Sequence, residues 1–114
     1  MKRKHAPFPN DVAEGLADGM FALSTPSRVQ IIGCLLDGPH AVGDITEALG
    51  MEQSAVSHQL RVLRDHALVV AERVGRRRVY ALADDHVRAL FEEALRHVTR
   101  LESTRPRAAP GPKG

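Results

Sequence analysis

Aromatic residues are scarce in this sequence, with three phenylalanines, one tyrosine and no tryptophan among 114 residues. So few rings offer little surface on which unpaired bases could stack, which argues against a binder of single-stranded nucleic acid. Cysteine is scarcer still. Cys34 stands alone, so no disulfide can form within the chain, and its apolar neighbours predict a buried packing role.

Long hydrophobic segments are also missing. No apolar run reaches membrane-spanning length, and the basic start MKRKH leads into no hydrophobic region of a secretory signal. We therefore expect a cytoplasmic protein with no membrane partner.

Positive charge is concentrated in one region, although the formal net charge is only +2. Residues 54–82 hold six arginines against two acidic residues, whereas residues 10–53 hold one arginine against seven acidic residues. A concentrated basic surface on a small domain indicates a polyanionic partner such as nucleic acid.

The length and composition predict one folded domain with two unstructured ends. Residues 1–9, with three basic side chains, are expected to form a flexible basic arm. Residues 10–102 are expected to form the folded domain. Residues 103–114 are rich in proline, glycine and charge, and we expect a disordered tail.

Two helices are predicted at the start of the domain. The first covers about residues 11–23, with Asn10 as its N-cap. The second covers about residues 26–37, because Thr25 is a good cap before a proline and Gly38-Pro39 ends a helix. Four of its apolar residues are expected in the core: Val29, Ile32, Leu35 and Leu36.

A helix-turn-helix is predicted next. A short helix ends at Gly50, and a longer one begins three residues later with Ser54 as its cap. The longer helix has an apolar stripe and an opposite polar side. A helix fits the major groove, where glutamine can pair with adenine and arginine with guanine. The residues predicted to contact DNA here are Gln53, Ser54, Ser57, His58, Gln59 and Arg61.

After this helix, the spacing of apolar residues changes from a helical pattern to one typical of extended strands. Residues 68–82 carry β-branched residues on both sides of Gly75, which predicts a two-stranded hairpin with glycine at its tip. Arg76, Arg77 and Arg78 would repel one another there and contribute little to folding, but they could reach phosphates or the minor groove. The expected fold is therefore a mainly α winged helix-turn-helix with a small β-hairpin, followed by a last helix that Asp84 and Asp85 cap.

Other classes of function find less support. Ser57 and His58 point about 100° apart on a helix and cannot form a nucleophile and base pair, and no glycine-rich phosphate loop is present, so we expect no enzyme. A solvated helix face and a pure interaction module are the structural alternatives to DNA binding. Both leave the arginine-rich tip unexplained.

The segments MEQSAVSHQLRVLRDHALV, VGRRRVYAL and DDHVRALFEEALRH, together with TPSR at the second helix, resemble the bacterial ArsR/SmtB metal-sensing repressors over about residues 12–102. The resemblance implies a homodimer that binds an imperfect inverted repeat in an operator and is released when metal binds. Two departures are visible. Ala67 stands where relatives usually have glycine, and the short third helix lacks the cysteine pair of arsenic and cadmium sensors.

His86 and His97 lie eleven residues apart in the last predicted helix, on one face but about 16 Å apart along its axis. One helix cannot bring both to the same ion. Two such helices packed antiparallel across a twofold axis would place Asp84 and His86 of one chain beside His97 of the other. The terminal helices are therefore expected to form the dimer interface. His40 and His66 are expected at the surface near turns.

The resemblance implies a metal site with the pattern Asp-x-His on one chain and His-x-x-His or Glu on the other. The matching residues are Asp84, His86, His97 and Arg100. Protonated arginine cannot bind a cation, so water, another group or His5 of the arm would complete the shell.

Imidazole and carboxylate ligands suit nickel, our leading choice, and also zinc or cobalt, none of them required for folding. In the alternative, the site is degenerate at Arg100, and a protein partner controls a metal-independent regulator or activator. The two histidines would then be polar residues of an interface.

Overall fold

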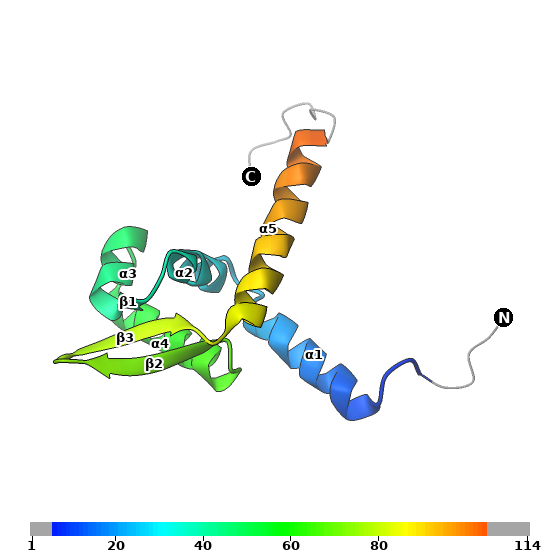
Figure 1. Ribbon diagram of the computed structural model, residues 1–114, viewed down its shortest axis with the longest axis horizontal. Helices are drawn as coiled ribbons and strands as arrows, with labels where there is room; N and C mark the ends of the chain where they lie inside the picture. Colours follow the sequence, from blue (N-terminus) through cyan, green and yellow to red (C-terminus); the bar gives the residue numbers. More distant parts are fainter. Residues whose placement is uncertain (1–5, 105–114) are drawn as a thin grey trace. The chain divides into compact units, whose positions relative to one another are not determined.

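The computed structural model describes residues 6–104, with side chains to residue 101. His5 and the tail from residue 105 lie outside the described residues. The elements in chain order are α1 (Asn10–Ala22), α2 (Pro26–Leu36), β1 (His40–Ala41), α3 (Val42–Leu49), α4 (Gln53–Asp65), β2 (Val69–Val74), β3 (Arg77–Leu82) and α5 (Asp85–Thr104) (Figure 1). They form two units: Met1–Asp84 contains everything up to β3, and Asp85–Gly114 contains α5.

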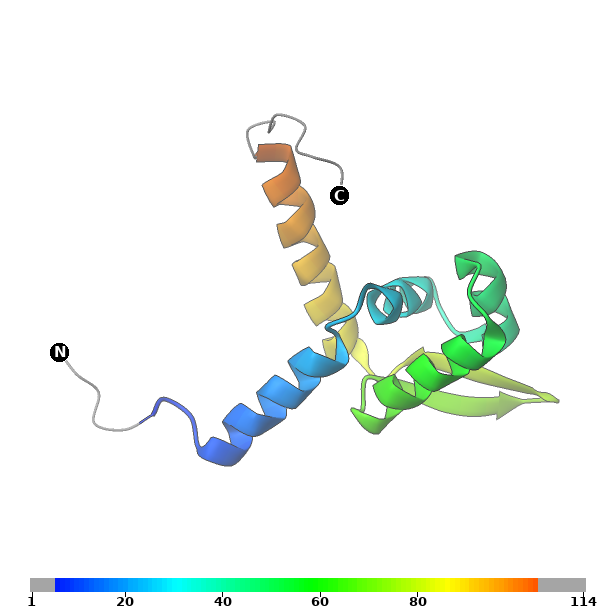
Figure 2. The same ribbon diagram turned by 180° about the vertical axis from the view of Figure 1, so that it is seen from behind.

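An aliphatic core in the first unit joins three helices to the sheet. Figures 1 and 2 show α2, α3 and α4 grouped beside the strands, with the β2–β3 hairpin extending beyond them. The core residues, each no more than 9% exposed, include Ile31, Ile32, Leu35, Ile45, Val56, Leu60, Leu63, Val69, Tyr80 and Leu82. The apolar stripe of α4 was expected from the sequence.

The buried face of α2 differs from the predicted one. Val29 is 41% exposed and Leu36 is only half-buried, so their assignment to the core was wrong. Ile31 is fully buried, and Arg28 is 8% exposed. The reason is the helical period: Arg28, Ile31 and Leu35 fall on one face at 100° per residue, and Val29 points away from it.

Two of the predicted helix caps are also wrong. Asn10 is the first residue of α1, where its amide donates to Glu14 Oε2 at 3.0 Å, and Pro9 holds the cap position. Ser54 lies inside the first turn of α4, which Glu52 precedes without a side-chain cap. Thr25 does cap α2, since its Oγ1 accepts the Arg28 N–H at 3.3 Å.

A short strand completes the sheet that the hairpin begins. The strand order is β1-β3-β2, all antiparallel, with His40 opposite Tyr80 and Ala41 opposite Val79. His40 is therefore half-buried in a strand rather than exposed at a turn, and its Nδ1 lies 2.8 Å from the Gly38 carbonyl oxygen. His66 is half-buried as well, with its Nδ1 2.9 Å from the Val62 carbonyl oxygen.

The hairpin turn has the predicted glycine at its tip. Val74 pairs with Arg77, which leaves Gly75 and Arg76 as a two-residue turn. Gly75 has φ 63, a conformation that favours glycine and lets the strands reverse tightly. The short α3 also ends as predicted, at Gly50 with φ 66.

The second unit presents a long apolar face without a covering element of its own. Leu90, Leu95 and Val98 on α5 are each more than half exposed. The helix continues to Thr104, two residues beyond the predicted end of the domain. No described helix combines the length and apolar character that crossing a membrane requires.

Ala67, which stands where relatives usually have glycine, adopts the left-handed conformation, with φ 59. It follows α4, and its N–H donates to the Arg64 carbonyl at 2.9 Å. A left-handed residue with a Cβ costs roughly 1–2 kcal/mol, of which the greater freedom of glycine in the unfolded chain cancels part. We expect Ala67→Gly to raise the free energy of unfolding by about 1 kcal/mol, measured by urea denaturation at fixed protein concentration.

The matched control is Ala48→Gly, at an exposed position inside α3 with ordinary helical geometry. That change should lower the free energy of unfolding by roughly 0.5–1 kcal/mol. A loss of stability in both variants would show that Ala67 is not strained.

Candidate nucleic-acid interface

The polar face of α4 is open to solvent where a recognition helix needs it. Gln53, Ser54, His58 and Arg61 are exposed, and Ser57 is half-buried among them. The opposite face holds Val56, Leu60 and Leu63 in the core, which orients the helix. The left-handed Gly50 turns the chain sharply between α3 and α4. The folded unit thus presents a polar helix face within a helix-turn-helix.

Gln59 is the exception among the predicted contacts of this helix. It is half-buried, and its Oε1 is buried without a hydrogen-bond partner among the described residues. At 100° per residue, Gln59 lies roughly 140–160° from Ser54 and Arg61 around the helix. The expectation that its amide faces a base edge therefore finds no support in this structure. Arg64, at seven residues from Ser57, shares the polar side instead.

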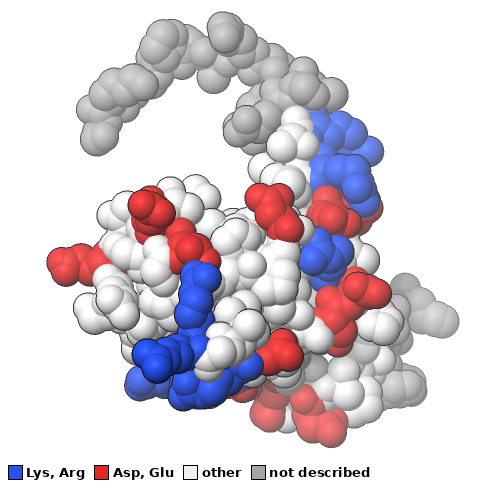
Figure 3. Space-filling model, turned by 60° about the vertical axis from the view of Figure 1, so that its left-hand side comes forward, with Lys and Arg blue, Asp and Glu red and all other residues white. Residues whose placement is uncertain are grey.

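The wing carries a basic cluster, which Figure 3 shows with acidic side chains at its border. Arg76 lies in the turn, and Arg77 and Arg78 follow on β3, all three exposed. Arg73 on β2 belongs to the same cluster, because it pairs directly with Arg78. Arg73 was not among the DNA-contacting residues predicted from the sequence. The two-residue turn at Gly75 was the signal that would have placed it opposite Arg78.

Two of the three consecutive arginines have defined partners in the wing. Arg77 Nη2 lies 2.8 Å from Asp44 Oδ2, in an ion pair between β3 and α3. The Arg78 guanidinium carbon lies 5.7 Å from the centre of the Tyr80 ring, a cation–π arrangement. Both arginines are exposed, so these contacts agree with the expectation that the arginines contribute little to folding. Arg76 remains at the turn with its side chain in solvent.

Asp44 has a carboxyl group whose pKa is lowered. The largest cause is the hydrogen bond from the Ala41 N–H to Asp44 Oδ2 at 3.1 Å, and the positive charge of Arg77 adds to it. Aspartate is already charged at neutral pH, and the lowered pKa extends the charged state to more acidic pH. Any stability that the charged form adds is present above the ordinary pKa of aspartate and is lost as the pH falls through the lowered value.

Cys34 is half-buried, less than the predicted fully buried position. Burial raises the pKa of its thiol, and the nearby negative charge of Asp37 adds to this effect. A raised pKa disfavours the thiolate, which is the reactive form. The packing role expected for Cys34 fits this environment better than a redox or metal-binding role.

The predicted metal ligands lie at or beside α5. His86 and His97 are both exposed on it, and Asp84 precedes the helix. Within the described residues of one chain, no three His, Cys, Asp or Glu side chains lie close enough together to hold a metal ion. The donor types suit a borderline divalent cation. Their spacing along one helix, however, requires a second chain to complete a site.

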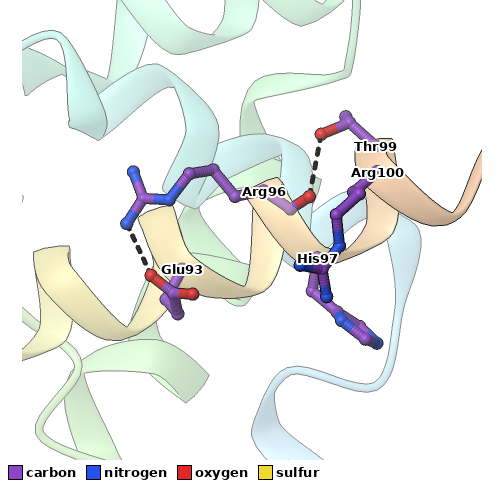
Figure 4. A pocket seen from close by; sticks show the side chains of 5 residues that line it. All are labelled: Glu93, Arg96, His97, Thr99 and Arg100. Carbon is purple, nitrogen blue, oxygen red and sulfur yellow. Dashed lines mark hydrogen bonds and ion pairs between the residues drawn. The ribbon is translucent and has the colours of Figure 1, made fainter. Parts of the chain in front are cut away.

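A shallow hollow on α5 contains His97. It is lined by Glu93, Arg96, His97, Thr99 and Arg100 (Figure 4). Arg96 Nη2 lies 2.6 Å from Glu93 Oε1, and this bond lowers the pKa of the Glu93 carboxyl group. Figure 4 shows the His97 and Arg100 side chains beside each other. The Arg100 guanidinium thus adds positive charge beside the imidazole that would bind a cation.

A polar recognition helix beside an arginine-bearing hairpin defines a winged helix-turn-helix DNA-binding protein, and solved structures agree. The homodimeric winged helix-turn-helix DNA-binding domain Mb0332 of Mycobacterium bovis, described as a possible ArsR-family transcriptional regulator, superposes with a TM-score of 0.77 at 27% identity, over 96% of this chain and 100% of that one. The solution structure of apo-NmtR gives a TM-score of 0.73 at 47% identity, over 97% of this chain and 93% of that one.

Sequence comparisons specify the family. Residues 25–70 match the profile described as "Bacterial regulatory protein, arsR family". The HTH-type transcriptional regulator NmtR of Mycobacterium tuberculosis is 52% identical over 99 residues, which cover 87% of this chain and 82% of that protein. This chain therefore belongs to the ArsR family of bacterial regulatory proteins. That membership confirms the expected fold, the expected family and the expectation of a transcription regulator rather than an enzyme.

Proposed function

We propose that this regulator acts as a homodimer on an inverted-repeat operator in the bacterial cytoplasm. The observation that carries the proposal is the exposed polar face of α4 beside the arginine-bearing wing. Arg61 and His58 would contact base edges, and Arg76 would contact phosphate. A twofold pair of such units matches an operator with twofold symmetry. The basic arm and the tail would flank the DNA-binding and dimerisation domain.

The homodimer is supported by apolar surface that a single chain leaves uncovered. On α1, Val12 is 45%, Leu16 is 50% and Met20 is 63% exposed. Leu90 and Val98 of α5 are 57% and 53% exposed. Contiguous apolar faces of this kind mark interaction surfaces in soluble proteins. The regular helical spacing on both elements favours a helix-to-helix interface between two copies of this chain.

We further propose that the dimer responds to a divalent metal, with nickel as the leading choice and zinc or cobalt as the others. Asp84 and His86 of one chain and His97 of a second chain would hold it, and water or His5 would complete the shell. A bound cation of this kind supplies positive charge and fixed geometry at the dimer interface. The ligands would thereby bias the relative orientation of the two chains, on which operator binding depends.

A metal-independent regulator is the second candidate, and one observation favours it. Arg100 occupies the position of the missing fourth ligand and lines the same hollow as His97. Its charge opposes a cation there. In this case a protein partner would control the regulator, which could act as an activator.

A gel-shift titration on the chain's own upstream region tests both candidates. Each of nickel, zinc and cobalt is added in turn to metal-free protein. Release of DNA by one metal supports the first candidate. Metal-insensitive binding supports the second, and absence of binding to any duplex contradicts both.

Substitution of two arginines is expected to change DNA binding in different ways. Arg61→Ala should change the preference among operator variants by about 1–3 kcal/mol at one base pair. Arg76→Ala should weaken binding to all sequences alike and reduce the slope of log K against log salt by about one. Arg96→Ala, on α5 with 68% of its side chain exposed, is the control and should change neither property. Equal behaviour of Arg61→Ala and Arg76→Ala would contradict the assigned division of roles.

A further inference from the structure

One carboxylate oxygen in the first unit joins three elements. Asp44 Oδ2 accepts the Ala41 N–H at 3.1 Å and the Arg77 Nη2 donor at 2.8 Å. Ala41 ends β1, Asp44 lies in the first turn of α3, and Arg77 begins β3. The two charged residues are 33 positions apart in the chain, so the contact exists only in the folded protein.

Stability alone is a weak reason for this ion pair. The side chains of Arg77 and Asp44 are 61% and 46% exposed, and an exposed pair contributes roughly 0.2–1 kcal/mol. The hydrogen bond to Ala41 needs an oxygen but no negative charge, since asparagine accepts such bonds as well as aspartate does. The Ala41 N–H is the largest cause of the lowered pKa of Asp44, but only the ion pair with Arg77 requires the negative charge.

Arg77 differs in this respect from the other wing arginines. In the described part of the chain, Arg73, Arg76 and Arg78 form no ion pair with a carboxylate. A carboxylate placed beside a surface that binds DNA repels phosphate and competes for the arginine that it contacts. Aspartate is ionised at neutral pH, and the lowered pKa of Asp44 extends this competition to more acidic pH.

We propose that Asp44 withholds the Arg77 guanidinium from the DNA backbone and so limits the sequence-independent affinity of the wing. The inference rests on the proposed DNA-binding function. Phosphate contacts strengthen binding to every sequence equally, so restraining one of them leaves a larger share of the binding energy to base contacts by α4. Asp44 thus tunes the overall affinity for DNA without touching DNA itself.

A double-mutant cycle tests the coupling. Wild type, Asp44→Asn, Arg77→Ala and the double variant are titrated, metal-free, with an operator duplex and an unrelated duplex between 50 and about 200 mM salt. Asp44→Asn keeps an oxygen for the Ala41 N–H and releases Arg77. It should steepen the salt slope by about one and raise affinity for the unrelated duplex on the order of 5- to 10-fold at about 0.1 M salt.

The other two variants should show that the effect passes through Arg77. Arg77→Ala should leave the wild-type slope nearly unchanged, and the double variant should match Arg77→Ala. Glu47→Gln is the matched control, because it removes the same charge from the exposed side of α3 one turn away. It should change the slope by much less. Circular dichroism and thermal melting check that each variant folds.

Three outcomes would overturn the inference. A slope reduced by one in Arg77→Ala would mean that Arg77 already contacts phosphate in the wild type. An equal effect of Asp44→Asn with and without Arg77 would mean that the carboxylate acts by direct repulsion. An unchanged slope in Asp44→Asn would mean that Arg77 is not released. In each case wild-type binding remains, so the proposed function stands. A wild type that binds neither duplex removes both.

Discussion

Val98→Glu is expected to separate the two subunits and to lower operator affinity by about 100-fold or more. Val98 lies near the middle of the apolar face of α5 and is 53% exposed in the single chain. A dimer that covers this face would have to bury the new carboxylate, which costs several kcal/mol without a partner. A monomer then binds one half-site at a time and loses the avidity of two linked contacts.

Arg96→Glu is the matched control for this change. It introduces the same side chain on the same helix, but about 160° away around the axis and on the polar side. Sedimentation velocity should show a dimer for Arg96→Glu and a monomer for Val98→Glu at equal concentration. In the gel-shift titration, Arg96→Glu should bind the operator as the wild type does, and Val98→Glu should bind it more weakly. A stable Val98→Glu dimer would place the interface elsewhere than on α5.

His97→Ala is expected to lower nickel affinity by about 100-fold or more while the dimer persists. Loss of a group that only supports a ligand already lowers metal affinity 10- to 100-fold, and loss of the ligand itself should cost at least as much. Isothermal titration with nickel, and competition against a chelator, measure the change. Sedimentation confirms that the subunits stay paired.

Two further variants make the nickel result specific. His66→Ala removes a half-buried histidine at the end of α4, outside the proposed ligand set, and should leave nickel affinity unchanged. Arg100→His places an imidazole where the family pattern has a fourth ligand and removes a positive charge beside His97, so it should strengthen binding. An unchanged titration for both His97→Ala and Arg100→His would show that no metal site forms here.

Strong local sequence patterns predicted the winged helix-turn-helix well. The β-branched residues around Gly75 specified the hairpin, because a two-residue turn there has few alternatives. Val56, Leu60 and Leu63 specified which side of α4 faces the core. Thr25 before Pro26 specified the start of α2. Each of these features depends on residues within about four positions of one another, so the local sequence is enough to predict it.

Residue type predicted the wrong environment for two residues at the boundary between the buried and the exposed face of a helix. Gln59 is polar and close to His58 and Arg61 in the chain, but its amide oxygen is buried. Val29 is apolar but lies on the exposed side of α2. Residue type suggests one environment in these cases, and helical rotation decides for the other. Counting 100° per residue would have corrected Gln59, but Val29 lies only about 60° from the buried Ile32, so the packing of α2 decided its exposure.

Periodicity and contiguous motifs predicted the order of the helices and of the two hairpin strands, the arginine-bearing turn and the family. Packing of the folded chain was needed to show that His40 and Ala41 form a strand against β3 and that Asp44 holds Arg77. These contacts join positions far apart in the chain, and each is worth only a small energy. Their existence depends on how the elements pack, which no local pattern encodes.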